Sequence, residues 1–339
     1  MTTPPRWQVR LACALAIGMA VGAFADLSWT HPRTEPSDFW QPWAAARLLV
    51  QGKNPYELIG PGRIYEHQWP LVYPATAAAA SIPFAWAPTR LADALFIGFG
   101  AAALAWTLTR HTLANPQLWV FASFAIAISA QTVQWSPLLT AAAMTPALGF
   151  LLAAKPTIGV ALFAAYPSRA ALYGAGLFGL LTIAIWPYWV TAWLANLHSL
   201  THMITPVTLW GGPLILLALL RWRRADARLV VALACVPQTP VLCEAVPLFL
   251  LVRTLREAVL LLVLTGIAGK IVGSTMSPSH YNEWMAANGQ WMVWLVYLPC
   301  TALVLCRPNE GLTFDWSRIW RRFIAAMRAA PLLTRTPSV

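Results

Sequence analysis

Residues 91–109 read LADALFIGFGAAALAWTLT, nineteen residues with a single charge at Asp93. A helix that crosses a bilayer needs about 20 mostly apolar residues, because no backbone amide can stay unpaired in hydrocarbon. Stretches of the same kind recur along the chain, at about 8–25, 117–134, 138–154, 170–187, 257–273 and 290–306. This pattern predicts an all-α integral membrane protein.

Other apolar stretches are short or broken. Residues 72–88 contain three prolines, 157–168 make little more than three turns, and 209–220 end at a run of arginines. The stretch 229–252 is interrupted by Pro237-Gln238-Thr239-Pro240. Two half-length helices there keep every arginine cluster inside, as the positive-inside rule requires. We therefore expect about twelve membrane segments, including short and broken helices, with both termini cytoplasmic.

These segments predict one polytopic membrane domain over 1–306 and a basic cytoplasmic tail over 307–339. The first segment also resembles a signal peptide, because Arg6 and Arg10 precede an apolar run that ends in Ala23-Phe24-Ala25. We expect it to be retained as a membrane helix, since its removal would leave an odd number of crossings. The five cysteines show no metal-ligand spacing and are expected to be free thiols.

Composition supports the membrane assignment. Of 339 residues, 58% are hydrophobic and 10% are charged, against about 25% charged in an average soluble domain. The net charge of +11 would suit nucleic acid, but the basic residues lie between apolar runs, so topology explains the charge and no nucleic-acid partner is expected.

Dividing the charges by side predicts where chemistry occurs. The expected cytoplasmic side holds 16 cations against five acids, with Arg90 and Asp93 among them. The exoplasmic side holds seven of each sign, Arg110 among the cations, and all six histidines, His111 included. Mixed acids, bases and imidazoles are typical of reaction sites, so we expect an exoplasmic site.

The longest polar stretch is a large first exoplasmic loop, at about 26–71. Ser37 has the chemistry of a helix N-cap, and apolar residues recur at helical spacing after it. A helix at the membrane interface is therefore expected, ending at Gly52. The apolar positions are Phe39, Trp43, Ala46, Leu49 and Val50.

The residues of this loop resemble a known family. Asp38-Phe39, Gly52 and Asn54-Pro55-Tyr56 resemble the first-loop pattern of the polyprenyl-phosphate-mannose-dependent mannosyltransferases, glycosyltransferase family 87 of the GT-C superfamily. Tyr73-Pro74, the segment 134–138 and Lys155-Pro156 agree with later motifs of that family. Ala75 and Val133 depart from it, standing where a Pro and a Gly are usual. The resemblance covers residues 8–170, and beyond them only hydropathy and helix number agree.

The resemblance implies a GT-C fold in a bacterial cytoplasmic membrane. It also implies transfer of a hexose such as mannose, with inversion, from a polyprenyl phosphate to a hydroxyl of an exoplasmic glycolipid or glycan. Such a displacement at an anomeric carbon needs a carboxylate to take the acceptor proton. The resemblance places that general base at Asp38; the alternative is that Asp38 only caps a helix. No metal and no other cofactor are expected.

Further candidates would hold the substrates. Lys155 lies in apolar surroundings, where an ammonium either meets an anion such as the donor phosphate or snorkels to the interface. Lys270 invites the same two interpretations. His198 and His202 share a helix face and could bind phosphate, whereas a metal would need a third ligand. The remaining substrate-binding candidates are Asp26, Trp40, Tyr56, Trp69, Tyr73 and Glu244.

Two other classes of protein are possible. Broken helices with intramembrane Lys and Glu also mark transporters, although no internal repeat is visible. A non-catalytic subunit of a membrane complex is the second alternative.

Overall fold

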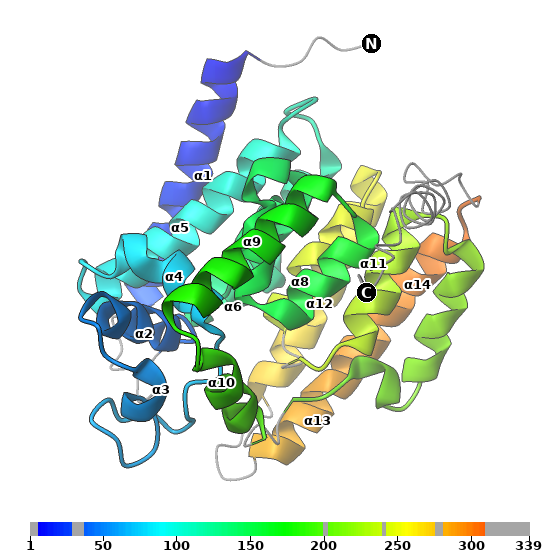
Figure 1. The fold of residues 1–339 in the computed structure, drawn as a ribbon. Coiled ribbons are helices and arrows are strands. Elements are labelled where there is room, and N and C mark those ends of the chain that lie inside the picture. The colour runs from blue at the N-terminus through cyan, green and yellow to red at the C-terminus, as the bar shows by residue number, and fades with distance from the viewer. Residues whose placement is uncertain (1–5, 29–36, 199–202, 239–241, 275–280, 309–339) are drawn as a thin grey trace, which may run out of the picture.

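The computed structural model describes residues 6–28, 37–198, 203–238, 242–274 and 281–308, and in them the protein is all-helical (Figure 1). Two of the described helices are long and apolar enough to cross a membrane, α1 (Trp7–Leu27) and α5 (Thr89–Leu108). A third span exists if α9 (Arg169–Ile185) and α10 (Trp189–Leu197), which meet at a 105° bend, are counted together. The all-α class and association with a membrane are thus supported, while about twelve segments stays a prediction.

α1 and α5 lie side by side through small residues (Figure 1). A Cβ atom built on Gly18 would lie 2.7 Å from the carbonyl oxygen of Gly98 and 2.8 Å from the Cβ of Ala102. One turn further along, a Cβ on Gly22 would lie 2.8 Å from the carbonyl oxygen of Ala94. Such close backbone approach is what glycine permits between membrane helices.

The two ends of this helix pair correct the expected topology. At one end Arg90 makes an ion pair with Asp26. At the other end Arg10 donates to the carbonyl oxygen of Trp106 at 2.9 Å. The two helices are therefore antiparallel, and the expectation that Arg90 and Asp26 lie on opposite sides is wrong. His111, which follows α5, therefore lies at the end of the helix pair where Arg10 is, and not at the end where the first loop is.

The reason is the length of the segment before α5. Residues 72–88 form only α4 (Ala75–Ser81) and a 3-10 turn, η2 (Ile82–Phe84), which together are too short to cross a bilayer. The chain therefore reaches Thr89 at the same end of the bundle where α1 stops, and Asp93 belongs to that end too.

Several expected spans are built from short pieces. Ser123 divides η3 (Pro116–Ala122) from α6 (Phe124–Thr132) and caps the latter by accepting from the amide of Ile126. The interrupted stretch 229–252 holds two separate helices, as the charge argument predicts. The remaining elements are α7 (Ser136–Met144), η4 (Pro146–Ala154), α8 (Pro156–Ala165), η5 (Pro206–Thr208), η6 (Gly212–Arg221), α11 (Ala225–Cys235), η7 (Leu242–Leu251), α12 (Leu255–Ser274), α13 (Tyr281–Met292), η9 (Val293–Tyr297) and α14 (Leu298–Leu305).

A buried ion-pair network closes the end of the bundle at α11, α12 and α14. Asp226 accepts from Arg224 at 2.8 Å and from Arg307 at 2.7 Å. Arg307 also reaches Glu257 at 2.8 Å. We call this the basic end. A hydrogen bond from Gln117 to the carbonyl oxygen of Leu250 joins it to η3, the helix that follows α5.

The first loop folds onto the opposite end, with α2 (Trp40–Val50) buried against α4 and α5 (Figure 1). Ser37 does not cap α2, whose N-cap is Phe39; its hydroxyl donates instead to Asp93 at 2.9 Å. Gly52 follows the helix with φ +71°, as expected of a helix stop. A short helix, α3 (Pro55–Leu58), then follows, and its N-cap Asn54 accepts from the amide of Tyr56.

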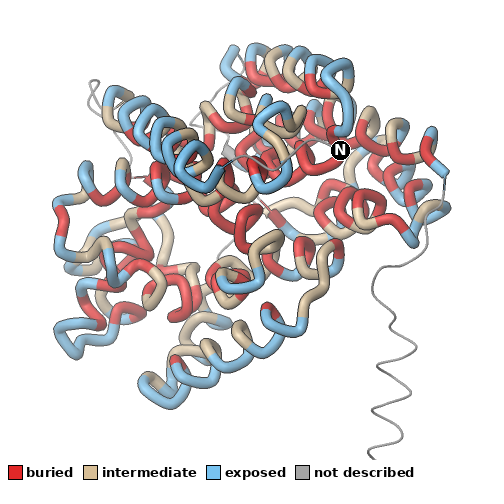
Figure 2. Tube along the Cα trace, turned by 90° about the horizontal axis from the view of Figure 1, so that it is seen from above, coloured by how far each residue is buried: buried red, intermediate tan, exposed pale blue. Residues whose placement is uncertain are grey.

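Burial is highest inside the bundle (Figure 2). The outer surface carries many large apolar side chains that are more than a third exposed. They include Met19, Phe99, Leu177, Leu180, Val263 and Ile267. Soluble monomers rarely expose so much apolar surface, so this surface suits contact with lipid.

Candidate functional site

Five polar side chains from distant parts of the chain form one hydrogen-bonded group, which we call the polar cluster: Asp38, Gln134, Ser136, Lys155 and Glu244. The Nε2 of Gln134 donates to the Oδ2 of Asp38. The Nζ of Lys155 lies 3.3 Å from the Oε1 of Gln134 and 2.5 Å from the Oε1 of Glu244. The hydroxyl of Ser136 donates to the Oε2 of Glu244 at 2.7 Å.

Burial within the polar cluster is graded. Glu244 is 1% exposed, Gln134 5%, and the side chain of Lys155 15%. Asp38, by contrast, is exposed. A buried ion pair is stable only when its remaining lone pairs are satisfied, and Ser136 and Gln134 do this for Glu244 and Lys155. Asp38 is therefore the member of the polar cluster that an incoming molecule reaches.

Short helices bring these residues together. Asp38 lies in the turn before α2, and its amide donates to the carbonyl oxygen of Thr132 at the end of α6. Gln134 and Ser136 come from the tight connection between α6 and α7, and Lys155 from the junction of η4 and α8. Glu244 comes from η7. The polar side chains of the cluster therefore come from the breaks between apolar stretches, where one short helix ends and the next begins.

Aromatic rings fix the neighbours of Asp38 and Gln134. Phe39 stacks on Phe96 of α5 with ring centroids 3.8 Å apart. Trp135 meets the same Phe96 edge-on at 4.8 Å and is fully buried. Phe96 is the eighth residue of α5, about 10 Å along the axis from its start. The polar cluster thus lies inward from the end of the bundle where α5 begins, beside these packed aromatic rings.

Tyr73 connects the polar cluster to the first loop. It lies near the charged groups of Lys155, Asp38 and Glu244. Its carbonyl oxygen accepts from the hydroxyl of Tyr56 at 2.9 Å. The segment before Tyr73 is held by α10, whose Trp193 indole donates to the carbonyl oxygen of Val72 at 2.8 Å.

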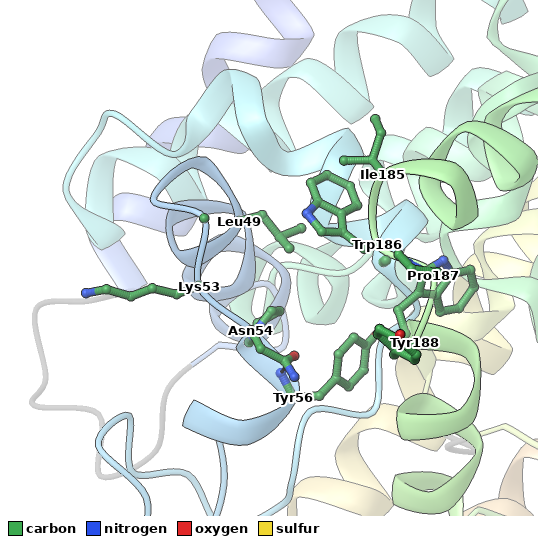
Figure 3. A pocket seen from close by; sticks show the side chains of 12 residues that line it. Leu49, Lys53, Asn54, Tyr56, Ile185, Trp186, Pro187 and Tyr188 are labelled. Carbon is green, nitrogen blue, oxygen red and sulfur yellow. Dashed lines mark hydrogen bonds between the residues drawn. The ribbon is translucent and has the colours of Figure 1, made fainter.

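A cavity of about 210 Å³ opens beside this connection, between the end of α2, α3 and the bend that joins α9 to α10. We call it the aromatic pocket. Tyr56, Trp186 and Tyr188 stand around it, and the Lys53 side chain extends outward from its edge (Figure 3). A mostly apolar cavity with a few polar groups is the usual form of a small-molecule site.

Other predicted site residues lie outside the polar cluster. Asp26 is held by Arg90, and Trp40 stacks on the ring of His67 with centroids 5.4 Å apart. The Trp69 carbonyl oxygen accepts from Gln41, which fastens its segment to α2. His198 and Lys270 are exposed and reach no member of the polar cluster. His202 lies outside the described residues.

Among the described residues, no group of three or more His, Cys, Asp or Glu side chains is placed to hold an ion. The ammonium of Lys155 stands close to Glu244 and beside Gln134, which in turn binds Asp38. The positive charge in the polar cluster is thus supplied by the chain itself.

Sequence reasoning missed two members of the polar cluster as site residues. Gln134 entered only as part of the segment that resembles the family, and Ser136 was given no role. The available signal was a short polar break between two apolar stretches, at 134–136. A polar group at such a break destabilises the fold unless it binds a partner.

Comparison with known proteins adds no assignment. No protein-family model, no curated protein and no solved structure matches the chain.

Proposed function

We propose that the protein is a membrane glycosyltransferase of the GT-C type. It would move a hexose from a polyprenyl-phosphate donor to a hydroxyl of a glycolipid or glycan on the exoplasmic face of a bacterial cytoplasmic membrane. The observation that carries the proposal is the carboxylate of the exposed residue Asp38, hydrogen-bonded to Gln134, which also contacts the partly buried Lys155.

Asp38 has the properties that a general base requires. The residue is exposed, so that an acceptor hydroxyl can approach it, while its backbone is fixed to Thr132. As the acceptor oxygen attacks the anomeric carbon, its proton passes to Asp38 and the bond to the donor phosphate breaks. Proton removal by a positioned carboxylate contributes about 100-fold or more to the rate.

Lys155 supports the leaving group in this proposal. An ammonium has three N–H donors, and two of them are directed to Gln134 and Glu244. The third is available for a phosphate oxygen, and the partial exposure of the side chain provides a path. A fixed positive charge near the departing phosphate stabilises the negative charge that develops there.

The aromatic pocket supplies room for the rest of the donor. Its walls are mostly apolar and aromatic, and it adjoins Tyr56, which is bonded to the Tyr73 segment. An isoprenoid chain requires an apolar wall and no hydrogen bonds. Lys53 lies at the edge of the pocket, where the phosphate of a lipid in the surrounding bilayer could approach it.

One observation also favours a transporter. The buried Lys155–Glu244 pair is the type of group that lines substrate pathways in membrane carriers. Membranes containing the protein, given radiolabelled polyprenyl-phosphate sugars and candidate acceptors, separate the two functions. Label in a lipid or glycan product supports transfer. No labelled product with any donor would favour the transporter.

A further inference from the structure

Gln134 connects the exposed acid of the polar cluster with its buried ion pair. Its amide nitrogen donates to Asp38 and its amide oxygen lies 3.3 Å from the Nζ of Lys155. A carboxylate only accepts and an ammonium only donates. The two charges therefore fix the amide in one orientation, since the flipped amide would face each charge with the wrong group.

The backbone before Gln134 adopts an unusual conformation. Val133 has φ 54° and ψ 64°, and within the described residues it is the only non-glycine with positive φ. A β-branched residue rarely adopts this conformation, and it persists only where the surroundings enforce it. Here it turns the chain between α6 and α7 so that Gln134 enters the polar cluster.

The same connection holds Asp38 at two points. Its amide donates to the carbonyl oxygen of Thr132, and its carboxylate accepts from the side chain of Gln134 two residues later. Ser136, two residues further on, donates to Glu244, and Glu244 pairs with Lys155. A closed ring of contacts thus runs from Asp38 through Gln134, Lys155, Glu244 and Ser136 back to the 132–136 turn.

We infer that Gln134 is a positioning residue: it orients the Asp38 carboxylate for proton transfer and couples it to the Lys155–Glu244 pair. This inference rests on the proposed function only for its kinetic consequence. The coupling itself is a property of the protein without substrate.

A labelling experiment tests the coupling without any substrate. A water-soluble carbodiimide modifies protonated carboxyl groups, and mass spectrometry of purified protein gives the extent of labelling at Asp38 against pH. Gln134→Met keeps the volume but donates no hydrogen bond. Because a donated hydrogen bond favours the ionised carboxylate, the midpoint of Asp38 labelling should move up by about one pH unit in this variant.

Controls separate this effect from general disturbance. The exposed Glu66 of the same loop should label identically in wild type and variant. Gln117→Met makes the same chemical change at a glutamine that bonds Leu250 near the basic end, and it should leave Asp38 labelling unchanged. An unchanged midpoint in folded Gln134→Met protein would overturn the inference.

Kinetics then distinguish the inference from the proposed function. If wild type transfers sugar, Gln134→Met should lower kcat about 10- to 100-fold with little change in the donor KM. It should also shift the acidic limb of the pH–rate profile to higher pH. A raised KM with unchanged kcat would instead mark Gln134 as a substrate ligand. If wild type transfers nothing from any donor, the proposed function fails while the labelling result still decides the role of Gln134.

Discussion

The Nζ of Lys155 lies 2.5 Å from the Oε1 of Glu244, although the two residues are 89 positions apart and belong to different broken stretches of the chain. Glu244 is 1% exposed, so its charge is separated from water. This contact ties η7 to the junction of η4 and α8 and places one fixed cation beside the exposed Asp38.

Breaking that pair should destabilise the protein. Lys155→Met leaves Glu244 buried without its cation, and removal of one partner of a buried pair costs about 3–5 kcal/mol. Replacing both partners by Met removes both charges, so Lys155→Met/Glu244→Met should recover much of the lost stability without recovering transfer. Thermal unfolding in detergent measures the loss of stability in the single variant and its recovery in the double variant. A double variant less stable than either single variant would contradict the account.

The basic end should show a defined acid sensitivity. Asp226 lies outside the expected spans 209–220 and 229–252. Burial raises the pKa of its carboxyl, but hydrogen bonds from Arg224 and Arg307 outweigh burial and hold the pKa below its ordinary value. A lowered pKa in the folded state contributes stability that is present above the ordinary value near 4 and lost as the pH falls further.

Asp226→Asn removes this contribution at every pH. The variant should therefore unfold at a lower temperature than wild type at pH 7, and the difference should shrink below about pH 4. Melting curves of both proteins between pH 3 and pH 7 measure this. A difference that stays constant over that range would show that the ion pairs are not responsible.

The corrected topology predicts accessibility. In a cysteine-free background, single cysteines at Arg90 and at Lys53 should react with an impermeant maleimide from the exoplasmic side. Cysteines at Arg110 and Arg223 should react only after the membrane is opened. The original division of charges expects the reverse for positions 90 and 110, so these two sites decide between the schemes.

Close packing of α1 and α5 should tolerate no side chain at Gly18. A leucine there meets the backbone of α5 within 3 Å, and no shift short of separating the helices relieves that contact. Gly176 on α9 has open space around it and provides a matched control. Gly18→Leu should lower the yield of folded protein, measured by size-exclusion chromatography, and Gly176→Leu should not. Equal yields would show that the helix contact is looser than described.

The sequence identified most members of the polar cluster because charges in apolar surroundings are conspicuous. Lys155 and Glu244 stood out for this reason, whereas Asp38 and Tyr73 were found through their places in motifs that resemble the family. Gln134 did not stand out, because its role depends on the left-handed turn at Val133, for which valine gives no local signal. Ser136 was missed because a serine is unremarkable until a buried carboxylate lies beside it.

Topology was harder to predict than the site. Residues 72–88 are apolar enough to be counted as a span, but their prolines limit the helical part to ten residues. That single error reversed the expected sides of Arg90, Asp93 and His111. Ser37 was misassigned as a cap for a related reason, since its partner Asp93 belongs to α5 and local spacing carries no information about it.

Sugar transfer by Asp38→Asn protein tests the central claim most directly. Membranes with wild type, Asp38→Asn or the first-loop control Glu66→Gln are given radiolabelled polyprenyl-phosphate sugar and acceptor, at matched amounts of folded protein. The account predicts transfer by wild type and Glu66→Gln and a loss of about 100-fold or more in Asp38→Asn. Undiminished transfer by Asp38→Asn would contradict it.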